Sequence, residues 1–155
     1  MNNDYINIYN NLVNLARNKN LYKIFTNQDT FSDRLIVLLF HFAFFLKIYS
    51  KNNKKNTLQN IYDHFFKQLE LSIREIGYGD VTINKKMKNY INIFHSLLEK
   101  IESWENIEKT KKNTIINSYL NINDKSHKLT EYFDNFHKNL TNNSLNSFAK
   151  GVIKT

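Results

Sequence analysis

Apolar residues recur at every third or fourth position along most of this 155-residue chain. That spacing gathers them on one face of an α-helix, whereas a half-buried β-strand would alternate apolar and polar residues at every second position. The first such segment runs over 5–18, and a shorter apolar patch at 21–25 predicts one more helical turn folded onto the core. The buried face predicted for the first helix consists of Ile6, Tyr9, Leu12, Val13 and Ala16. The pattern therefore predicts an all-α fold.

The most apolar segment of the chain is 35–46, which is interrupted only by His41. It is well short of the roughly 20 apolar residues that a membrane-spanning helix needs, so it predicts the buried central helix of a bundle. Thr30 and Asp33 suit the start of that helix. A threonine hydroxyl accepts a hydrogen bond from an unpaired amide, and a carboxylate is favoured at the positive end of the helix dipole.

Arg34 and His41 are seven positions apart and share one face of this central helix. The structural interpretation of His41 is a core histidine with one hydrogen-bond partner, because buried polar groups are ordinarily satisfied locally. The functional interpretation is a polar seam through the centre of the bundle, with His41 as a ligand or catalytic group. We favour the first interpretation and keep both residues as candidates for partner contact.

A polar loop, KNNKKN at 51–56, leads to the most regular amphipathic pattern in the chain, and its charges are interpreted as solvated surface. The stripe after it predicts a helix with a buried face of Leu58, Ile61, Tyr62, Phe65, Phe66, Leu69, Ile73 and Ile76. Gly77 stands where a left-handed C-terminal cap needs a residue without a Cβ atom, and Gly79 is expected to turn the chain again at once. Between them, Tyr78 is the aromatic residue that we expect to be exposed.

The next helix is predicted to begin within 82–84. Its predicted buried face consists of Met87, Tyr90, Ile91, Phe94, Leu97, Leu98, Ile101 and Trp104. Lys85, Lys86 and Lys88 would then occupy its first turn, where cations oppose the helix dipole. These lysines are either a solvated helix start or an electrostatic contact retained for a partner. Asp80 would neutralise one of them.

Shorter apolar patterns at 115–120 and 129–140 complete the predicted bundle. The tail, 141–155, is weakly amphipathic through Leu145, Phe148 and Val152, and we expect it to fray. The absence of proline and the presence of only three glycines argue against a fold with many turns. We therefore expect residues 1–155 to form a single-domain bundle of about five or six helices.

The sequence offers little catalytic or metal-binding chemistry. It has no cysteine, and none of its five histidines falls in an HExxH or comparable metal-ligating spacing. It has no glycine-rich phosphate loop. The carboxylates at three-residue steps are interpreted as the solvated face of a helix, namely Glu99, Glu102, Glu105 and Glu108. We therefore expect a protein that is not an enzyme and that has no catalytic residues, metal or cofactor.

A net charge of +8 favours anionic partners, but by itself it supports only non-specific attraction. A basic helical nucleic-acid-binding or scaffold protein is the alternative function that this charge leaves open. The first ten residues, MNNDYINIYN, have neither the apolar core of a signal peptide nor the arginine-rich, acid-poor composition of a transit peptide. We expect the protein to stay in the compartment where it is made.

The stretch REIGYGDVTINKKMK at 74–88 is similar to the segment LREMGVGDxxVxKxxK of the ubiquinol-cytochrome c chaperone family, the assembly factors of the cytochrome bc1 complex. Upstream, IYNNLVNLARNKNLYKIF resembles the family's opening helix, and QDTFSDRLIVLLFHFAFFLK resembles its next segment. The resemblance extends over about 9–140 and is specific mainly up to Lys88. The chain departs from the family pattern at three positions: Gln28 replaces a proline, Asp33 a glycine and Asn117 an arginine.

The resemblance implies an all-α fold and a non-enzymatic role, which is to hold newly made cytochrome b until it receives haem and its partner subunits. It also implies a small partner protein, and the basic charge adds the ribosome or an anionic membrane surface. We expect a location in a bacterial cytoplasm, peripheral to the inner membrane, with the mitochondrial matrix as the alternative. The candidate residues for client or partner contact are Arg34, His41, Arg74, Glu75, Gly77, Tyr78, Gly79, Asp80, Lys85, Lys86 and Lys88.

Overall fold

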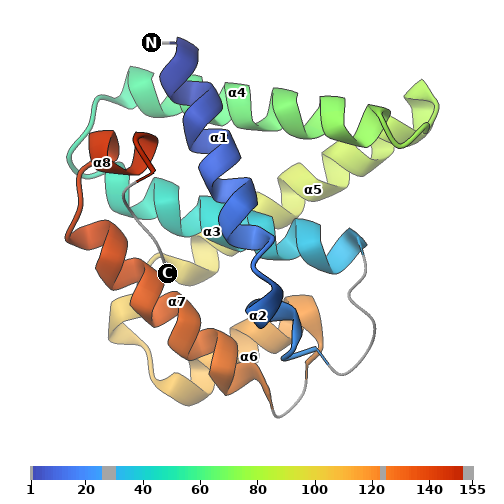
Figure 1. The fold of residues 1–155 in the computed structure, drawn as a ribbon. Helices are drawn as coiled ribbons and strands as arrows, with labels where there is room; N and C mark the ends of the chain where they lie inside the picture. The colour runs from blue at the N-terminus through green and yellow to red at the C-terminus, as the bar shows by residue number, and fades with distance from the viewer. Residues whose placement is uncertain (1, 26–30, 123–124, 152–155) are drawn as a thin grey trace.

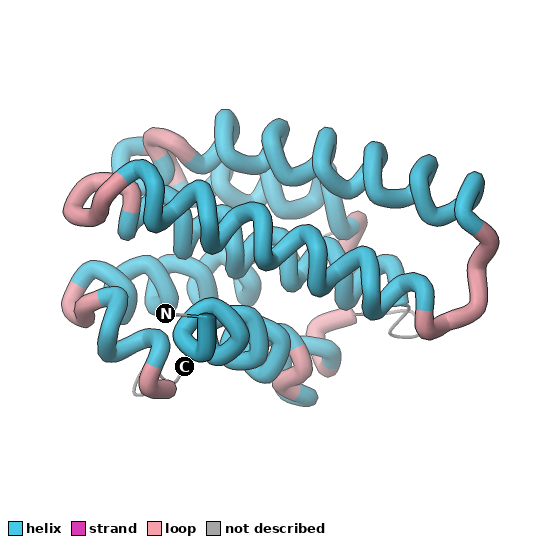
Figure 2. Tube along the Cα trace, turned by 90° about the horizontal axis from the view of Figure 1, so that it is seen from above, coloured by secondary structure: helices cyan, strands magenta, loops and turns pink. Residues whose placement is uncertain are grey.

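The computed structural model describes residues 2–25, 31–122 and 125–151, and these residues form helices joined by loops, without a strand (Figure 2). The all-α prediction is confirmed. The helices are α1 (Asn2–Ala16), α2 (Lys19–Tyr22), α3 (Phe31–Tyr49), α4 (Lys55–Arg74), α5 (Asp80–Ile101), a 3-10 turn η1 (Trp104–Asn106), α6 (Lys109–Leu120), α7 (Ser126–Thr141) and α8 (Leu145–Ala149). The six long helices match the predicted ones, and the short α2 and α8 bring the described number to eight.

Helix α3 lies at the centre of the fold and packs against α1, α5, α6 and α7 (Figure 1). Every side chain from Leu35 to Phe45 is buried, as its continuous apolar sequence predicts. None of the described helices combines the length and the hydropathy needed to cross a bilayer. The cap predicted at Thr30 lies outside the described residues.

Aromatic rings on opposite faces of α3 join two parts of the core. On one face Phe42 stacks on Phe65 of α4 and Phe94 of α5, with ring centroids 3.8 Å and 5.1 Å away. On the other face Phe44 packs edge-on against Trp104 at 5.1 Å and stacks on Phe133 of α7 at 5.3 Å. Aromatic pairs at such separations add to the free energy of burial, so α3 holds both parts of the bundle together.

The first helix and the C-terminal tail differ from their predicted packing. Ile6 was expected in the core but is exposed, whereas Ile8 is buried in its place. The reason is that α1 packs against α3, α4 and α8, and these neighbours select which of its apolar positions face inward. In the tail, Phe148 of α8 is buried, and its carbonyl accepts a hydrogen bond of 2.8 Å from Asn11 Nδ2. Fraying is therefore wrong for α8, and Val152 lies outside the described residues.

His41 is a core histidine, the interpretation that we favoured from the sequence, and the alternative of a polar seam from His41 to Arg34 is wrong. The ring of His41 is fully buried, with Nδ1 2.8 Å from the Val37 carbonyl and Nε2 2.6 Å from the Tyr132 hydroxyl. Since a carbonyl only accepts, Nδ1 donates to Val37 and Nε2 accepts from Tyr132. Arg34 is exposed instead, with its guanidinium 5.7 Å from the centroid of the Tyr22 ring.

Acid should destabilise the protein through His41. Burial lowers the pKa of His41 from 6.5 to about 4, so the unfolded chain takes up a proton that the folded chain resists. This contribution to stability is complete above about pH 6.5 and is lost as the pH falls toward 4, for a total of about 3 kcal/mol. The free energy of unfolding, measured by urea denaturation at several pH values, should depend less on pH for His41→Gln than for the parent protein. Equal slopes would contradict this assignment.

A partly buried polar network that the sequence did not predict joins η1, α6 and α7. One carboxylate oxygen of Asp134 accepts from Trp104 Nε1 at 2.8 Å and from Lys112 Nζ at 2.9 Å. Nearby, Lys47 Nζ lies 3.0 Å from Glu105, a residue expected on a solvated helix face but found in η1. The four glutamates at three-residue steps, Glu99 to Glu108, do not lie on one helix, because α5 ends at Ile101. These pairs fix the position of Trp104 in the core.

Candidate functional site

The sharp turn between α4 and α5 carries most of the residues singled out by sequence. Helix α4 ends at Arg74, and the Gly77 amide donates to the Arg74 carbonyl at 3.0 Å. Gly77 has a φ of 105°, so the positive φ expected for a residue without a Cβ atom is confirmed. Gly79 is different, because its φ of −74° and ψ of 162° are extended values that any residue adopts. The chain does turn at Gly79 into the next helix, α5 (Asp80–Ile101), but this turn does not require a residue without a Cβ atom.

Replacing Gly77 with valine should destabilise the protein by about 1–3 kcal/mol, the range for a residue held in a sparsely populated backbone region. The cause is backbone strain alone, because a Cβ atom added at either glycine of the turn would have no neighbouring atom within 4 Å. Gly79→Val is the matched control and should unfold close to the parent protein. Chemical denaturation of the three proteins measures the difference. Equal stability of the two variants would show that Gly77 does not require its positive φ.

Helix α5 begins at Asp80 rather than within 82–84, and this changes the interpretation of its lysines. Its extended N-cap, Gly79, has no side chain that could mark the boundary in the sequence. Asp80 therefore occupies the first turn, where an acid suits the helix dipole, and the three lysines lie beyond that turn. The prediction that they oppose the dipole in the first turn is wrong.

Charged residues pair across the turn between the two helices. Arg74 Nη1 donates to Asp80 Oδ1 at 2.5 Å, and the other terminal nitrogen of Arg74 lies 3.8 Å from Glu70 Oε1. The hydrogen bond to Asp80 raises the pKa of Arg74. Asp80 thus neutralises an arginine of α4, where the sequence predicted a lysine of α5. The pair links the end of α4 to the start of α5.

Four apolar side chains are exposed at this turn, and we call residues 71–88 the α4–α5 corner. The exposed side chains are Leu71, Ile76, Tyr78 and Val81, with Val81 81% exposed. Ile76 was predicted as buried but lies beyond the end of α4, so its side chain is outside the core. The exposure predicted for Tyr78 is confirmed, and Lys86 Nζ lies 4.7 Å from its ring centroid. The corner projects at one end of the α4–α5 pair (Figure 1).

Basic side chains continue from the apolar tip along α5. Val81, Lys85 and Lys88 are all exposed, and their spacing of four and three residues places them on one helix face. The corner therefore contains nine of the eleven candidate residues: Arg74, Glu75, Gly77, Tyr78, Gly79, Asp80, Lys85, Lys86 and Lys88. The other two lie elsewhere. His41 is in the core, and Arg34 lines a 580 Å³ cavity with Arg17 and Phe31.

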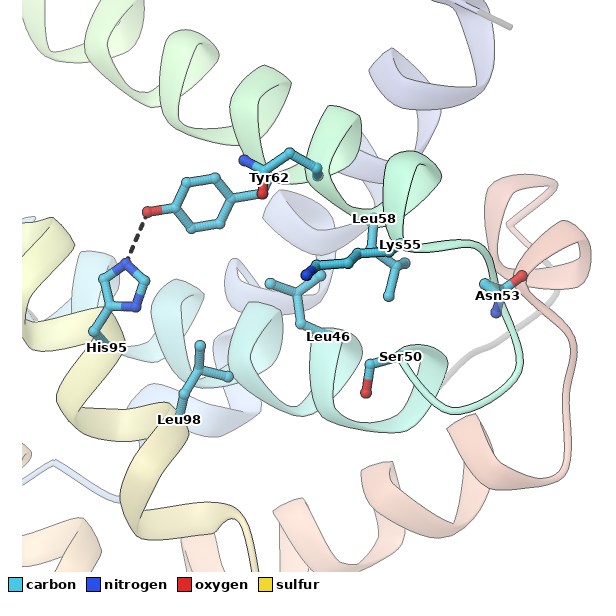
Figure 3. Close-up of a pocket in the computed structure, with 9 residues that line it drawn as sticks. Leu46, Ser50, Asn53, Lys55, Leu58, Tyr62, His95 and Leu98 are labelled. Carbon is cyan, nitrogen blue, oxygen red and sulfur yellow. Dashed lines mark hydrogen bonds between the residues drawn. The ribbon is translucent and has the colours of Figure 1, made fainter.

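A separate groove of about 630 Å³ lies between α3, α4 and α5 at the other end of the α4–α5 pair (Figure 3). Its lining includes Leu46, Leu58 and Leu98, with Lys55 at its rim. One wall is a hydrogen-bonded pair, in which the Tyr62 hydroxyl lies 2.9 Å from His95 Nε2. The sequence did not predict this groove, because its leucines have the same helical spacing as core residues. Among the described residues, no group of three or more His, Asp or Glu is placed to hold a metal ion.

A comparison with known protein families supports the resemblance that the sequence of the corner shows. The family described as ubiquinol-cytochrome C chaperone matches residues 23–112, which is more than half of the chain and includes all of α3, α4 and α5. No curated protein and no solved structure gives a significant match to the chain. This protein therefore belongs to the ubiquinol-cytochrome C chaperone family, and its general role is that of an assembly chaperone for the cytochrome bc1 complex.

Proposed function

We propose that this protein holds newly made cytochrome b during assembly of the bc1 complex and that the α4–α5 corner contacts this client. The observation that supports the contact is the exposure of Leu71, Ile76, Tyr78 and Val81 within the projecting corner, from the end of α4 to the start of α5. Leaving apolar surface in water costs about 25 cal/mol per Å², and clustered exposed apolar residues mark interaction sites. A membrane protein that has not yet met its partner subunits offers apolar helices that would cover this surface.

The lysines of the corner support a second contact, with an anionic surface. Lys85 and Lys88 continue the face of Val81, so an apolar segment bound at the tip would lie next to positive charge. Phospholipid headgroups and ribosomal RNA are the anionic surfaces that surround a membrane protein as it is made. We place the protein in a bacterial cytoplasm beside the inner membrane, with the mitochondrial matrix as the alternative, acting without catalysis and together with a small partner protein.

A photo-crosslinking amino acid in place of Val81 should trap cytochrome b in cells that assemble the bc1 complex. Val81 is the most exposed of the four apolar side chains at the corner, so its replacement should leave folding intact. The matched control carries the same amino acid at Lys128, an exposed residue of α7. Mass spectrometry of the irradiated adducts should identify cytochrome b from position 81 and not from position 128.

Two outcomes of the crosslinking would overturn the proposal. Equal trapping of cytochrome b from both positions would mean that the corner is not the client contact. Adducts with RNA and none with a membrane protein would favour the alternative function, a basic nucleic-acid-binding or scaffold protein, which the net charge of +8 supports.

A further inference from the structure

The groove between α3, α4 and α5 is longer than the cavity in Figure 3. A second depression of about 510 Å³ shares Leu46, Ser50 and Leu98 with the first, so the two form one continuous groove along the end of α3. We call it the α3-end groove. Leu58 of α4 adds to its apolar floor, on which Leu46 and Leu98 remain partly exposed. A continuous apolar floor of this kind suits one face of an amphipathic helix.

The charges around the α3-end groove are mainly positive. Lys51 and Lys55 are exposed on its lining, whereas the Lys47 side chain is only 8% exposed and pairs with Glu105 at 3.0 Å. Glu102 is the acidic residue on the lining. A bound segment with carboxylates beside its apolar face would therefore meet two exposed lysines, while a segment with basic flanks would be repelled.

Two polar side chains of the loop at the groove, Ser50 and Asn53, have hydrogen-bond partners within the protein. Ser50 Oγ donates to the Lys47 carbonyl at 2.9 Å, and Asn53 Nδ2 donates to the Tyr49 carbonyl at 2.9 Å. These bonds hold the end of α3 and the loop after it in place, and the Tyr62–His95 pair holds α4 against α5. The groove is thus preformed, which lowers the entropy cost of binding a segment in it.

We propose that the α3-end groove binds an amphipathic helix of a partner protein, with its apolar face on Leu46, Leu58 and Leu98 and its acidic flank toward Lys51 and Lys55. This site is distinct from the α4–α5 corner. Leu58 and Leu71 are 13 residues apart on α4, which is about 20 Å along the helix axis. One copy of the chain can therefore bind a client at the corner and a second protein at the groove simultaneously.

A labelled peptide of about 18 residues, long enough for five helical turns, tests this proposal. It carries leucine at every third and fourth position with glutamate on both flanks, and fluorescence anisotropy measures its binding to the full chain. Binding to the double variant Lys51→Glu, Lys55→Glu should weaken at least about tenfold, because two attractive contacts become repulsive. The control Lys111→Glu, Lys128→Glu makes the same charge change at exposed residues of α6 and α7, away from the groove and the corner, and should bind like the parent.

Unfolding cannot account for the expected loss. Lys55 is the first residue of α4, so glutamate there suits the helix dipole and the variant should be at least as stable as the parent. Leu98→Gln tests the apolar floor separately and should also weaken binding, with its helicity checked by circular dichroism. A second peptide with lysine flanks and the same leucines should bind more weakly than the glutamate peptide.

Three results would overturn the proposal. The first is equal weakening by the two charge-reversal pairs, which would mean non-specific attraction to the net charge. The second is equal binding of the glutamate-flanked and lysine-flanked peptides. The third concerns competition by phosphatidylglycerol vesicles. If the vesicles displace the peptide from the parent but not from the Lys51→Glu, Lys55→Glu variant, the groove binds a lipid surface. Crosslinking at Val81 tests the corner alone, so either proposal can fail without the other.

Discussion

Deletion of this protein should lower the amount of assembled bc1 complex without lowering the transcript for cytochrome b. A chaperone acts on the protein after it is made, and unassembled apolar helices that lack a binding partner aggregate or are degraded. Absorbance of b-type haem in isolated membranes and native gels of the complex measure the assembled amount, and RNA quantification measures the transcript. Normal haem absorbance in the deletion strain would contradict the proposed client.

Complementation of the deletion strain links this phenotype to the α4–α5 corner. A plasmid copy of the parent should restore the complex, whereas Val81→Asp combined with Ile76→Asp should restore much less, because two carboxylates would replace exposed apolar contacts. Both positions are exposed, so the double variant should accumulate at the level of the parent. Full restoration by this variant at equal protein level would place the client contact elsewhere.

Replacing Phe42 with alanine should destabilise the protein by about 3–5 kcal/mol, the range for truncating a fully buried phenylalanine. Phe42 is inaccessible to solvent and stacks on rings from α4 and α5, with centroids 3.8 Å and 5.1 Å away. The truncation would leave a cavity where α3 packs against α4 and α5. Neither of these helices can move to fill the cavity without losing other contacts with α3. Thermal unfolding should shift down by roughly 6–20 °C, from about 2–4 °C per kcal/mol for a domain of this size.

Phe31→Ala is the matched control for Phe42→Ala, because it truncates the same side chain on the same helix. Phe31 is 45% exposed at the start of α3, so its loss leaves no enclosed cavity. Its melting temperature should stay within a few degrees of that of the parent. Similar losses for both variants would mean that α3 is not packed as its burial indicates.

The order of the helices could be predicted from the sequence because amphipathic periodicity is a local property. The residues of α4 repeat their apolar face over twenty positions, and the apolar run of α3 requires burial on all sides. The positive φ of Gly77 was also predictable, since a glycine directly after a long amphipathic pattern marks a left-handed cap. Most of the candidate residues lie together at the corner for a similar reason: they are neighbours in the sequence.

Tertiary structure alone decided which surfaces are free and which polar groups meet. Asp134 lies 30 residues from Trp104 and 22 from Lys112, so no local spacing could predict that it binds both. Leu46 and Leu98 have the periodicity of core residues, yet they stay partly exposed in a groove because no element of the described chain covers them fully there. Periodicity determines which face of a helix is apolar. Whether that face is buried depends on the packing of helices that are distant in sequence, and at this groove the packing leaves an apolar floor with exposed lysines beside it.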